Sequence, residues 1–279
     1  MAATVSISRC RVVNEHDRGG HVGADRAIGI EVGVSMISAG VVDSRTGAVV
    51  ARCHEATPNG ATEVLRTCAA IAGQLASRHS VGFIGLAVPE RVERDGAVPR
   101  AVTRSWRSTD VRLAFADIAP ALVHSDVRAA AFCEAQAGAA RGLECFVYIT
   151  VGTEVSSVVV RHGRPWEDPS DDAPAVTVRP VGLVSGRSGP AGHDGPEAIV
   201  DAKRLGEEVG RVVNLIEPDA VVVGGALGLD LHHRQLWVSA MRQSEWHRPA
   251  ACVPVVEAQF KADAVLVGAA LASGSLVAA

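Results

Sequence analysis

The chain has no excess of positive charge and no long apolar run, and each absence excludes a class of protein. It has 27 Lys and Arg against 31 Asp and Glu, for a formal net charge of −4. Its arginines are scattered rather than clustered, so nucleic acid and anionic membranes are not expected partners. No stretch approaches the roughly 20 apolar residues of a membrane-spanning helix. We therefore expect a soluble protein with no membrane association.

The chain also lacks any CxxC pair. Its six cysteines are widely spaced, and most lie in apolar surroundings: Cys10, Cys53, Cys68, Cys133, Cys145 and Cys252. Such cysteines are typical of reduced, largely buried residues rather than of metal ligands or a disulfide framework. Residues 1–26 contain several charged residues and no apolar core of a secretory signal. These features predict a cytoplasmic protein.

The length and composition favour two lobes. A chain of 279 residues with 48% hydrophobic content can bury one large core or two modest ones. We expect a polar, loosely packed N-terminal extension over residues 1–26, an N-terminal α/β lobe over 27–120 and a C-terminal α/β lobe over 121–279.

The first lobe begins with three β-rich runs. These cover residues 27–32, 36–42 and 48–52, separated by turn residues, and predict an antiparallel meander. Apolar residues at helical spacing predict a helix over 61–79. A buried strand over 81–88 follows and stops before a proline.

A similar order recurs later in the chain. Residues 146–163 again form strand, glycine turn, strand and polar turn, so that Gly152 corresponds to Gly33 and Gly163 to Gly47. A helix over 196–217 then leads into a strand over 220–223.

Two similar lobes imply a cleft between them. We expect this cleft to be lined by the turns after Val32 and Val151 and by the Gly224-Gly225 turn, where backbone can approach a ligand closely. The alternative is that these glycines only form tight turns.

Asp126 is the central residue of this pattern. It lies between the apolar segment 121–124 and an Ala-rich helix that stops at Gly142, and the following strand 145–151 leads into a Gly-Thr turn. A carboxylate at such a junction can deprotonate a hydroxyl, and turn amides can hold phosphate oxygens. This arrangement suits phosphoryl transfer to a sugar hydroxyl. Alternatively, Asp126 is only a helix N-cap.

Six stretches carry a family pattern in their order and spacing: GIEVGVSMISAGVVD (29–43), GLAVPERVERDGAV (85–98), Trp106, HSDVRAAAFCEAQAGAARGLECFVYITVGT (124–153), NLIEPDAVVVGGAL (214–227) and ADAVLVGAALAS (262–273). With them, the chain resembles the ROK family of bacterial sugar kinases and sugar-responsive repressors over most of residues 27–272. That family lies within the actin-like ATPase superfamily. The resemblance implies an α/β fold with two similar lobes of the actin-like ATPase (ribonuclease H-like) type and a cleft between them.

The resemblance also implies an ATP-dependent sugar kinase and assigns roles to residues. Asp126 falls on the catalytic base, and Ser125 and Asp126 would bind the substrate. Glu31 would bind Mg²⁺ through water. The first phosphate loop falls on 29–43, the second on 150–157 and the nucleotide turn on Gly224-Gly225. The residues expected to bind ATP are Gly33, Ser35, Gly152, Thr153, Gly224 and Gly225.

Both phosphate loops depart from the family pattern. The first typically reads Asp-x-Gly-Gly-Thr-Lys, whereas Glu31 is followed here by Gly33, Val34, Ser35 and Met36, so that one glycine and the basic residue are missing. The second typically reads Gly-Thr-Gly-x-Gly, and Glu154 replaces its central glycine. A carboxylate at that position should weaken ATP binding by charge repulsion, unless it turns outward or binds a metal ion. The asparagine that usually precedes the catalytic aspartate is Ser125.

The family's zinc module is also missing. Members usually carry a Gly-His and three cysteines in the segment that corresponds to 164–196, and this segment contains no cysteine. We therefore expect no structural zinc. Gly192-His193 alone matches the motif, and a single histidine in a Gly/Pro-rich loop is more often an ordinary loop residue.

Two functions remain in competition. The first is a divergent kinase that transfers the γ-phosphoryl group of ATP to a sugar or a sugar-like cyclitol, and retention of Asp126 favours it. The second is a catalytically degenerate sugar-binding or regulatory protein, which the altered loops and the missing zinc module favour. A repressor is disfavoured because about 26 polar residues cannot hold a DNA-binding helix-turn-helix. A homodimer is the assembly expected first.

Overall fold

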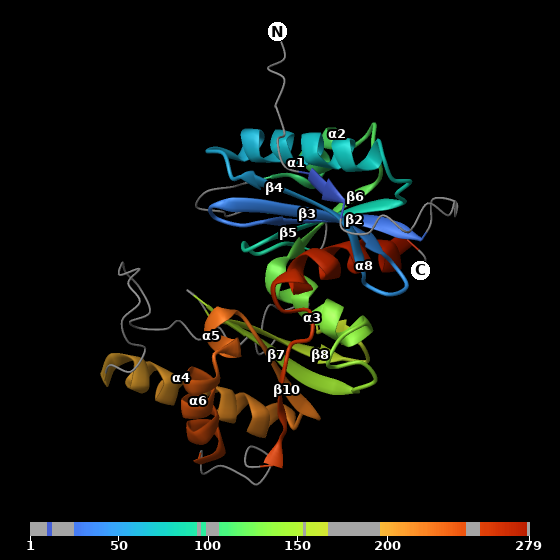
Figure 1. Ribbon diagram of the computed structural model, residues 1–279. Helices are drawn as coiled ribbons and strands as arrows, with labels where there is room; N and C mark the ends of the chain where they lie inside the picture. The colour runs from blue at the N-terminus through green and yellow to red at the C-terminus, as the bar shows by residue number, and fades with distance from the viewer. Residues whose placement is uncertain are drawn as a thin grey trace. The chain divides into compact units, whose positions relative to one another are not determined.

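The computed structural model describes residues 10–12, 25–93, 96–98, 106–152, 155–166, 196–243 and 252–277 (Figure 1). The chain forms two compact units. Unit 1 comprises residues 1–133 and 263–279, and unit 2 comprises residues 134–262. Each unit has its own β-sheet with helices, which confirms the expected α/β class.

Unit 1 contains a six-stranded sheet in the order β1-β4-β3-β2-β5-β6. Strands β1 to β4 pair antiparallel, whereas β2, β5 and β6 pair in parallel. The strands are β1 (Cys10–Val12), β2 (Arg26–Val32), β3 (Met36–Asp43), β4 (Val49–Ala56), β5 (Phe83–Val88) and β6 (Ala121–Ser125). The helices are α1 (Ala61–Ala76), α2 (Ser108–Ala114), the first part of α3 (Asp126–Gln136), the short 3-10 helix η1 (Lys261–Asp263), which begins in unit 2, and α8 (Ala264–Val277).

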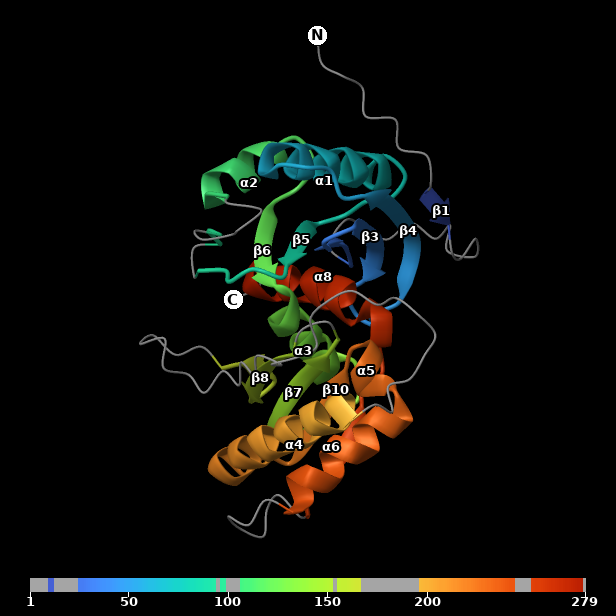
Figure 2. The ribbon, with the colours of Figure 1, turned by 90° about the vertical axis from the view of Figure 1, so that its left-hand side faces the viewer.

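The two faces of this sheet bury different kinds of residue. One face is covered by α1 and α2 and presents large side chains such as Ile28, Ile30 and Leu86 (Figures 1 and 2). The opposite face carries glycines and is covered by α8. A Cβ atom added at Gly29 or Gly85 would lie within 2.0 Å of a backbone oxygen of α8. The absence of side chains therefore lets α8 lie directly against β2 and β5.

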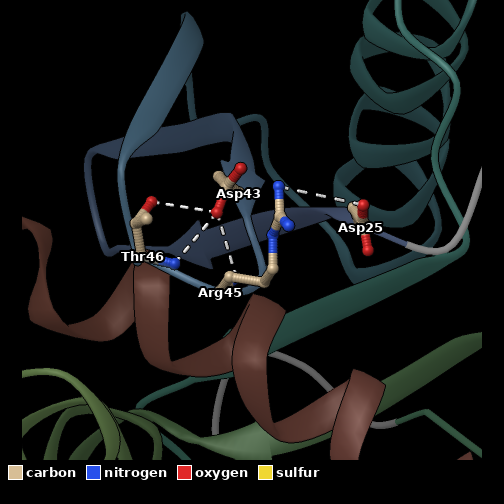
Figure 3. A network of polar contacts seen from close by, with 4 residues as sticks. All are labelled: Asp25, Asp43, Arg45 and Thr46. Atoms are coloured by element: carbon tan, nitrogen blue, oxygen red, sulfur yellow. Dashed lines mark hydrogen bonds and ion pairs between the residues drawn. The ribbon is translucent and has the colours of Figure 1, made fainter. Parts of the chain in front are cut away.

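The β3–β4 turn is fixed by a network of polar contacts (Figure 3). Oδ1 of Asp43 accepts hydrogen bonds from the backbone N–H groups of Arg45 and Thr46, at 3.0 and 2.9 Å, and from the Thr46 hydroxyl. Burial acts to raise the pKa of Asp43, but these hydrogen bonds outweigh it and hold the pKa below its usual value. Arg45 also lies 4.0 Å from Asp25. The network stabilises the amino end of β2, at the edge of the sheet opposite the carboxyl ends of β2, β5 and β6.

The N-terminal segment departs from the expectation of a loose extension. Residues Cys10–Val12 form β1, which pairs with β4 and extends the sheet by one strand. Cys53 forms a disulfide bond. In the pairing of β1 with β4, Cys53 lies opposite Cys10. The expectation that all six cysteines are reduced is therefore wrong for Cys53. Cys68, Cys133, Cys145 and Cys252 are free.

Unit 2 contains a five-stranded sheet in the order β11-β10-β7-β8-β9. Its strands are β7 (Cys145–Val151), β8 (Val155–Arg161), β9 (Arg164–Pro165), β10 (Ala220–Gly224) and β11 (Val255–Glu257). Its helices are α4 (Pro196–Ile216), α5 (Ala226–Leu229) and α6 (Leu231–Gln243). Helices α4 and α6 lie side by side against the sheet (Figure 2), where Leu205, Trp237 and Met241 pack on β7 and β10. The two sheets repeat one detail, since Gly47 and Gly163 both adopt φ of 73° in their turns.

A buried carboxylate connects the two ends of unit 2 through hydrogen bonds. Glu134, the first residue of the unit, is fully buried. It accepts hydrogen bonds from the backbone N–H groups of Ala139, Gln259 and Phe260 at 2.8 to 3.0 Å. Glu134 thereby joins the segment that enters unit 2 to the segment that leaves it.

The compact units divide the chain differently from the division expected at residue 120. Strand β6 pairs in parallel with β5, and α8 covers the sheet of unit 1, so residues 121–133 and 263–279 belong to that unit. The helices of the described residues include none that is both long and apolar enough to cross a membrane.

Candidate functional site

The carboxyl ends of β2, β5 and β6 place several predicted site residues at one edge of the unit 1 sheet. Glu31 pairs with Ala87 of β5, and Ser125 pairs with Val88 of the same strand. Asp126 directly follows Ser125 and begins α3. Ligands of parallel α/β sheets bind outside the carboxyl ends of the strands. Glu31, Ser125 and Asp126 therefore lie where such a sheet presents its chemistry.

Asp126 occupies the strand-to-helix junction that the sequence predicted. Its Oδ1 accepts a hydrogen bond from the backbone N–H of Val127 at 2.5 Å, and the residue is only partly buried. A side-chain cap usually binds the N–H two or three residues further on. The observed bond to the next residue fixes the direction of the carboxylate. The site thus holds a partly exposed carboxylate in a defined orientation.

Glu31 has an unusual electrostatic environment. Burial, followed by the charges of Asp126 and Asp263, raises the pKa of Glu31 to about 7. Its side chain projects from β2 toward the face that α8 covers, since successive side chains alternate and Ile30 and Val32 pack in the core under α1. A carboxylate with a pKa near 7 holds a proton that a divalent cation can displace.

Asp263 is a member of this site that the sequence analysis missed. Arg52 of β4 binds it through two hydrogen bonds of 2.6 Å, one to each carboxylate oxygen. The pair is partly buried, with side-chain exposures of 28% and 34%. Asp263 lies just before the apolar run that forms α8. An acidic residue directly before an apolar helix was the feature of the sequence that could have pointed to Asp263 as a site residue. Its partner is 211 residues away in the chain and has no local signature.

The β2–β3 turn, expected to contact phosphate, is closed by its own hydrogen bonds. The N–H of Gly33 donates to the carbonyl of Met36 at 3.0 Å. Thr57 binds the carbonyls of Gly33 and Ser35 through its hydroxyl and its N–H, at 2.9 and 3.1 Å. Ser35 is exposed at the tip, beside Val34 and Met36, which are 85% and 50% exposed. The turn thus presents one hydroxyl and two apolar side chains.

The glycines of unit 2 lie at the carboxyl ends of two adjacent parallel strands. Gly152 follows β7, and Gly224 ends β10, where it pairs with Thr150. Gly225 has φ of 81°, and a Cβ atom there would lie 2.4 Å from the carbonyl oxygen of Val151. At Gly224, a Cβ atom would lie 2.5 Å from the Tyr148 hydroxyl. Packing within unit 2 therefore already requires glycine at both positions.

The predicted site residues fall into two groups. Glu31, Gly33, Ser35, Ser125 and Asp126 lie at one edge of the unit 1 sheet. Gly152, Gly224 and Gly225 lie at one edge of the unit 2 sheet. Thr153, Glu154 and Gly192-His193 lie outside the described residues.

The comparison with family models gives one assignment. The model of the ROK family matches residues 27–170, just over half of the chain. No curated protein matches the sequence.

Solved structures of that family share the fold. A ROK hexokinase from Thermus thermophilus aligns with a TM-score of 0.69 at 22% identity, covering 91% of this chain and 99% of the hexokinase. A ROK family glucokinase from Streptomyces griseus, solved with glucose and AMPPNP, has the same TM-score and identity and covers 90% and 99%. A ROK family transcriptional regulator, a homologue of the E. coli MLC protein, aligns with a TM-score of 0.68 at 17% identity, covering 88% and 77%.

Proposed function

The chain belongs to the ROK family, and from that premise we propose that it is an ATP-dependent kinase that phosphorylates a hydroxyl group of a sugar or of a sugar-like cyclitol. The single observation that carries the proposal is the placement of Asp126. It stands at the carboxyl end of β6, at the start of α3, with its carboxylate oriented by the Val127 N–H. Solved neighbours of the fold include a glucokinase bound to glucose and AMPPNP.

In the proposed reaction, Asp126 acts as the general base. Its carboxylate, which the backbone N–H of Val127 orients through Oδ1, accepts the proton of the substrate hydroxyl. The freed oxygen attacks the γ-phosphorus of ATP, the new O–P bond forms, and the bond to the ADP oxygen breaks. Ser125 would donate or accept a hydrogen bond with a neighbouring substrate hydroxyl. Positioning and charge stabilisation supply most of the catalysis in such transfers.

Magnesium fits the residues at Glu31. The described residues contain no group of three His, Cys, Asp or Glu that could hold a metal ion by themselves. Mg²⁺ is, however, usually bound through one or two carboxylates, with waters and substrate phosphates as the other ligands. Glu31 is a carboxylate whose pKa of about 7 would fall when a cation replaces its proton. A bound Mg²⁺ would neutralise charge on the transferred phosphoryl group.

ATP is the proposed phosphoryl donor, and two turns would receive it. In unit 1, the hydroxyl of Ser35 and backbone of the β2–β3 turn beyond Gly33 would contact phosphate oxygens. In unit 2, we assign phosphate contacts to Gly152 and Thr153 and nucleotide contacts to Gly224 and Gly225. These glycine assignments rest on the family resemblance, since packing alone accounts for the last two glycines.

A catalytically degenerate sugar-binding protein is the second candidate, and the β2–β3 turn favours it. The N–H of Gly33 is engaged by Met36, and the exposed Val34 and Met36 side chains offer no charge to a phosphate. A regulator of the same family shares the fold. This candidate keeps sugar binding but predicts no turnover.

The decisive experiment compares wild type with Asp126→Asn in a coupled ADP-release assay over hexoses, amino sugars and cyclitols. Asparagine caps a helix about as well as aspartate but cannot accept the proton. The expected result is an unchanged fold, retained ATP affinity and a loss of turnover of about 100- to 10,000-fold. Equal rates for both proteins would refute the role of Asp126. No turnover by wild type on the full panel would favour the degenerate protein.

A thermal-shift measurement tests the nucleotide separately. ATP with Mg²⁺ at about 100 times its dissociation constant should stabilise the protein by about 2.7 kcal/mol. A melting temperature that does not respond to millimolar nucleotide would exclude the kinase.

A further inference from the structure

The C-terminal helix α8 contacts the chain on both sides of Asp126. Asp126 lies at the junction of β6 and α3, and junction residues move when the elements on either side move. The contacts of α8 fall two residues before Asp126, at His124, and three residues after it, at Ala129. All of these residues belong to unit 1.

The first contact is a hydrogen bond. Nε2 of His124 lies 3.0 Å from the hydroxyl oxygen of Ser273 on α8. Ser273 is fully buried, and burial lowers the pKa of His124 to about 4, so the ring is neutral near pH 7. A neutral ring bonded to a buried hydroxyl gives a fixed connection between the end of β6 and α8.

The second contact is a close approach of backbones. A Cβ atom added at Gly268 of α8 would lie 1.8 Å from the carbonyl oxygen of Ala129, and 2.4 Å from its carbonyl carbon. Beside this contact, Ala129 packs with Ala87 and Ala269 in a small buried cluster. Only glycine at position 268 allows the first turn of α3 to lie this close to α8.

We propose that Gly268 and Ser273 are positioning residues for Asp126. α8 itself is fixed, because Gly29 and Gly85 let it lie directly on β2 and β5. Because α8 is held by the sheet and contacts His124 and Ala129, it restricts movement of the β6–α3 junction that carries Asp126. The catalytic part of this inference rests on the proposed kinase function, in which a displacement of about 1 Å at the reacting group can cost roughly 100-fold in rate.

The test uses two identical substitutions on the same helix. Gly268→Ala puts a methyl group against Ala129, whereas at Gly274 no described atom other than adjoining residues and backbone of α8 itself lies within 4 Å of the added carbon. Both changes raise helix propensity equally. Gly268→Ala is expected to lower kcat about 10- to 100-fold, with the KM for ATP within twofold of wild type. Gly274→Ala is expected to leave both parameters unchanged.

A second measurement does not need turnover. The Val127 N–H donates to Asp126, so its hydrogen exchange, followed by NMR, reports the geometry of the junction. Exchange at Val127 should be at least tenfold faster in Gly268→Ala than in Gly274→Ala. If wild type phosphorylates nothing, the kinase function fails, and this exchange difference still decides the positioning role.

Ser273→Ala is the second variant, because Gly268→Ala could prevent folding. It removes the partner of His124 without adding bulk. The expected result is faster exchange at Val127 and, in an active enzyme, a several-fold lower kcat with unchanged KM for ATP. The proposal is overturned if the folded Gly268→Ala and Ser273→Ala proteins match Gly274→Ala in exchange at Val127, or if their loss of activity lies in KM alone.

Discussion

At the scale of single residues, Glu134 shows how backbone hydrogen bonds can satisfy a buried carboxyl group. Its carboxylate accepts three backbone N–H groups, one from Ala139 and two from Gln259 and Phe260. A Cβ atom at Gly138 would lie 2.1 Å from Oε2 of Glu134, so the turn after α3 also requires glycine to enclose it.

We predict that Glu134→Gln lowers the free energy of unfolding by about 2 kcal/mol or more. The glutamine amide would place an NH₂ group against at least one of the three N–H donors, and that donor would lose its acceptor. Urea unfolding measures the change. The matched control is Glu208→Gln, which removes an exposed ion pair with Arg211 and should change stability by less than 1 kcal/mol. Equal effects of the two substitutions would contradict this account of Glu134.

The pH dependence of stability contains a contribution from His124. Its pKa is about 4 in the folded state, against an ordinary value of 6.5. Between these values the unfolded chain binds a proton that the folded chain does not, so stability falls as the pH falls from about 6.5 to 4. The loss is on the order of 3 kcal/mol at most. Denaturant unfolding of His124→Gln should show a flatter pH dependence over this range than unfolding of the wild type.

Single residues were predicted from the sequence when they stood at the boundary of an element. Asp126 was found because it lies between an apolar segment and an Ala-rich helix, and that junction is present. Glu134 was not singled out, although a lone acidic residue after the apolar run Ala129–Cys133 was a signal. Its three donors come from two distant segments, and the sequence does not show that they meet. Arg52 and Asp263 were missed for the same reason.

At the scale of elements, periodicity located most strands and helices to within a few residues. The meander was expected over 27–52, and the structure has β2, β3 and β4 there. β7 matches its expected bounds, and α4 and β10 differ from theirs by a single residue. Helix α8 has no alternation of polar and apolar faces in its sequence. Its small Gly and Ala residues pack against the backbones of the sheet and of α3, so it has little polar surface. Strand β1 was missed because it is only three residues long and its pairing with β4 is a contact between distant parts of the chain.

The β2–β3 turn leads to a prediction about nucleotide affinity. Met36 is half exposed at the turn, and lysine at this position would add a positive charge where ATP phosphates are proposed to bind. Met36→Lys should tighten ATP binding about fivefold, which corresponds to roughly 1 kcal/mol. Isothermal titration calorimetry measures it. Leu113→Lys adds the same charge at an exposed apolar position of α2 and should leave the affinity unchanged. Equal gains from both variants would indicate a general charge effect.

At the scale of the whole molecule, the chain enters unit 2 once and returns to unit 1 once. The sequence predicted two α/β lobes from the repeated order of strands and helices, and two units with separate sheets are present. Their boundary could not be predicted from this repeat, because β6 and α8 complete unit 1 from segments that follow its apparent end. Parallel pairing of β6 with β5 and packing of α8 on glycines are contacts between distant parts of the chain.

The discontinuous unit 1 predicts a difference between fragments. Residues 134–262 contain Glu134 together with Gln259 and Phe260, so this fragment should fold alone and melt cooperatively. Residues 1–133 lack α8, and the face of their sheet around Gly29 and Gly85 would be uncovered. This fragment should aggregate. Joining it to residues 263–279 through a flexible Gly/Ser linker of about ten residues should restore a cooperative melt. Circular dichroism and size-exclusion chromatography distinguish these outcomes, and a folded, monomeric 1–133 fragment would show that α8 is dispensable.

The late position of α8 in the chain also sets an order of events during translation. Residues 134–262 leave the ribosome before α8 does, and at 5 to 20 residues per second this takes on the order of 10 s. Throughout that interval the nascent unit 1 exposes the strand face that α8 will cover, and it is then a substrate for chaperones that bind uncovered β-sheets. Ribosomes that stall before residue 263 would therefore carry an unfinished unit 1.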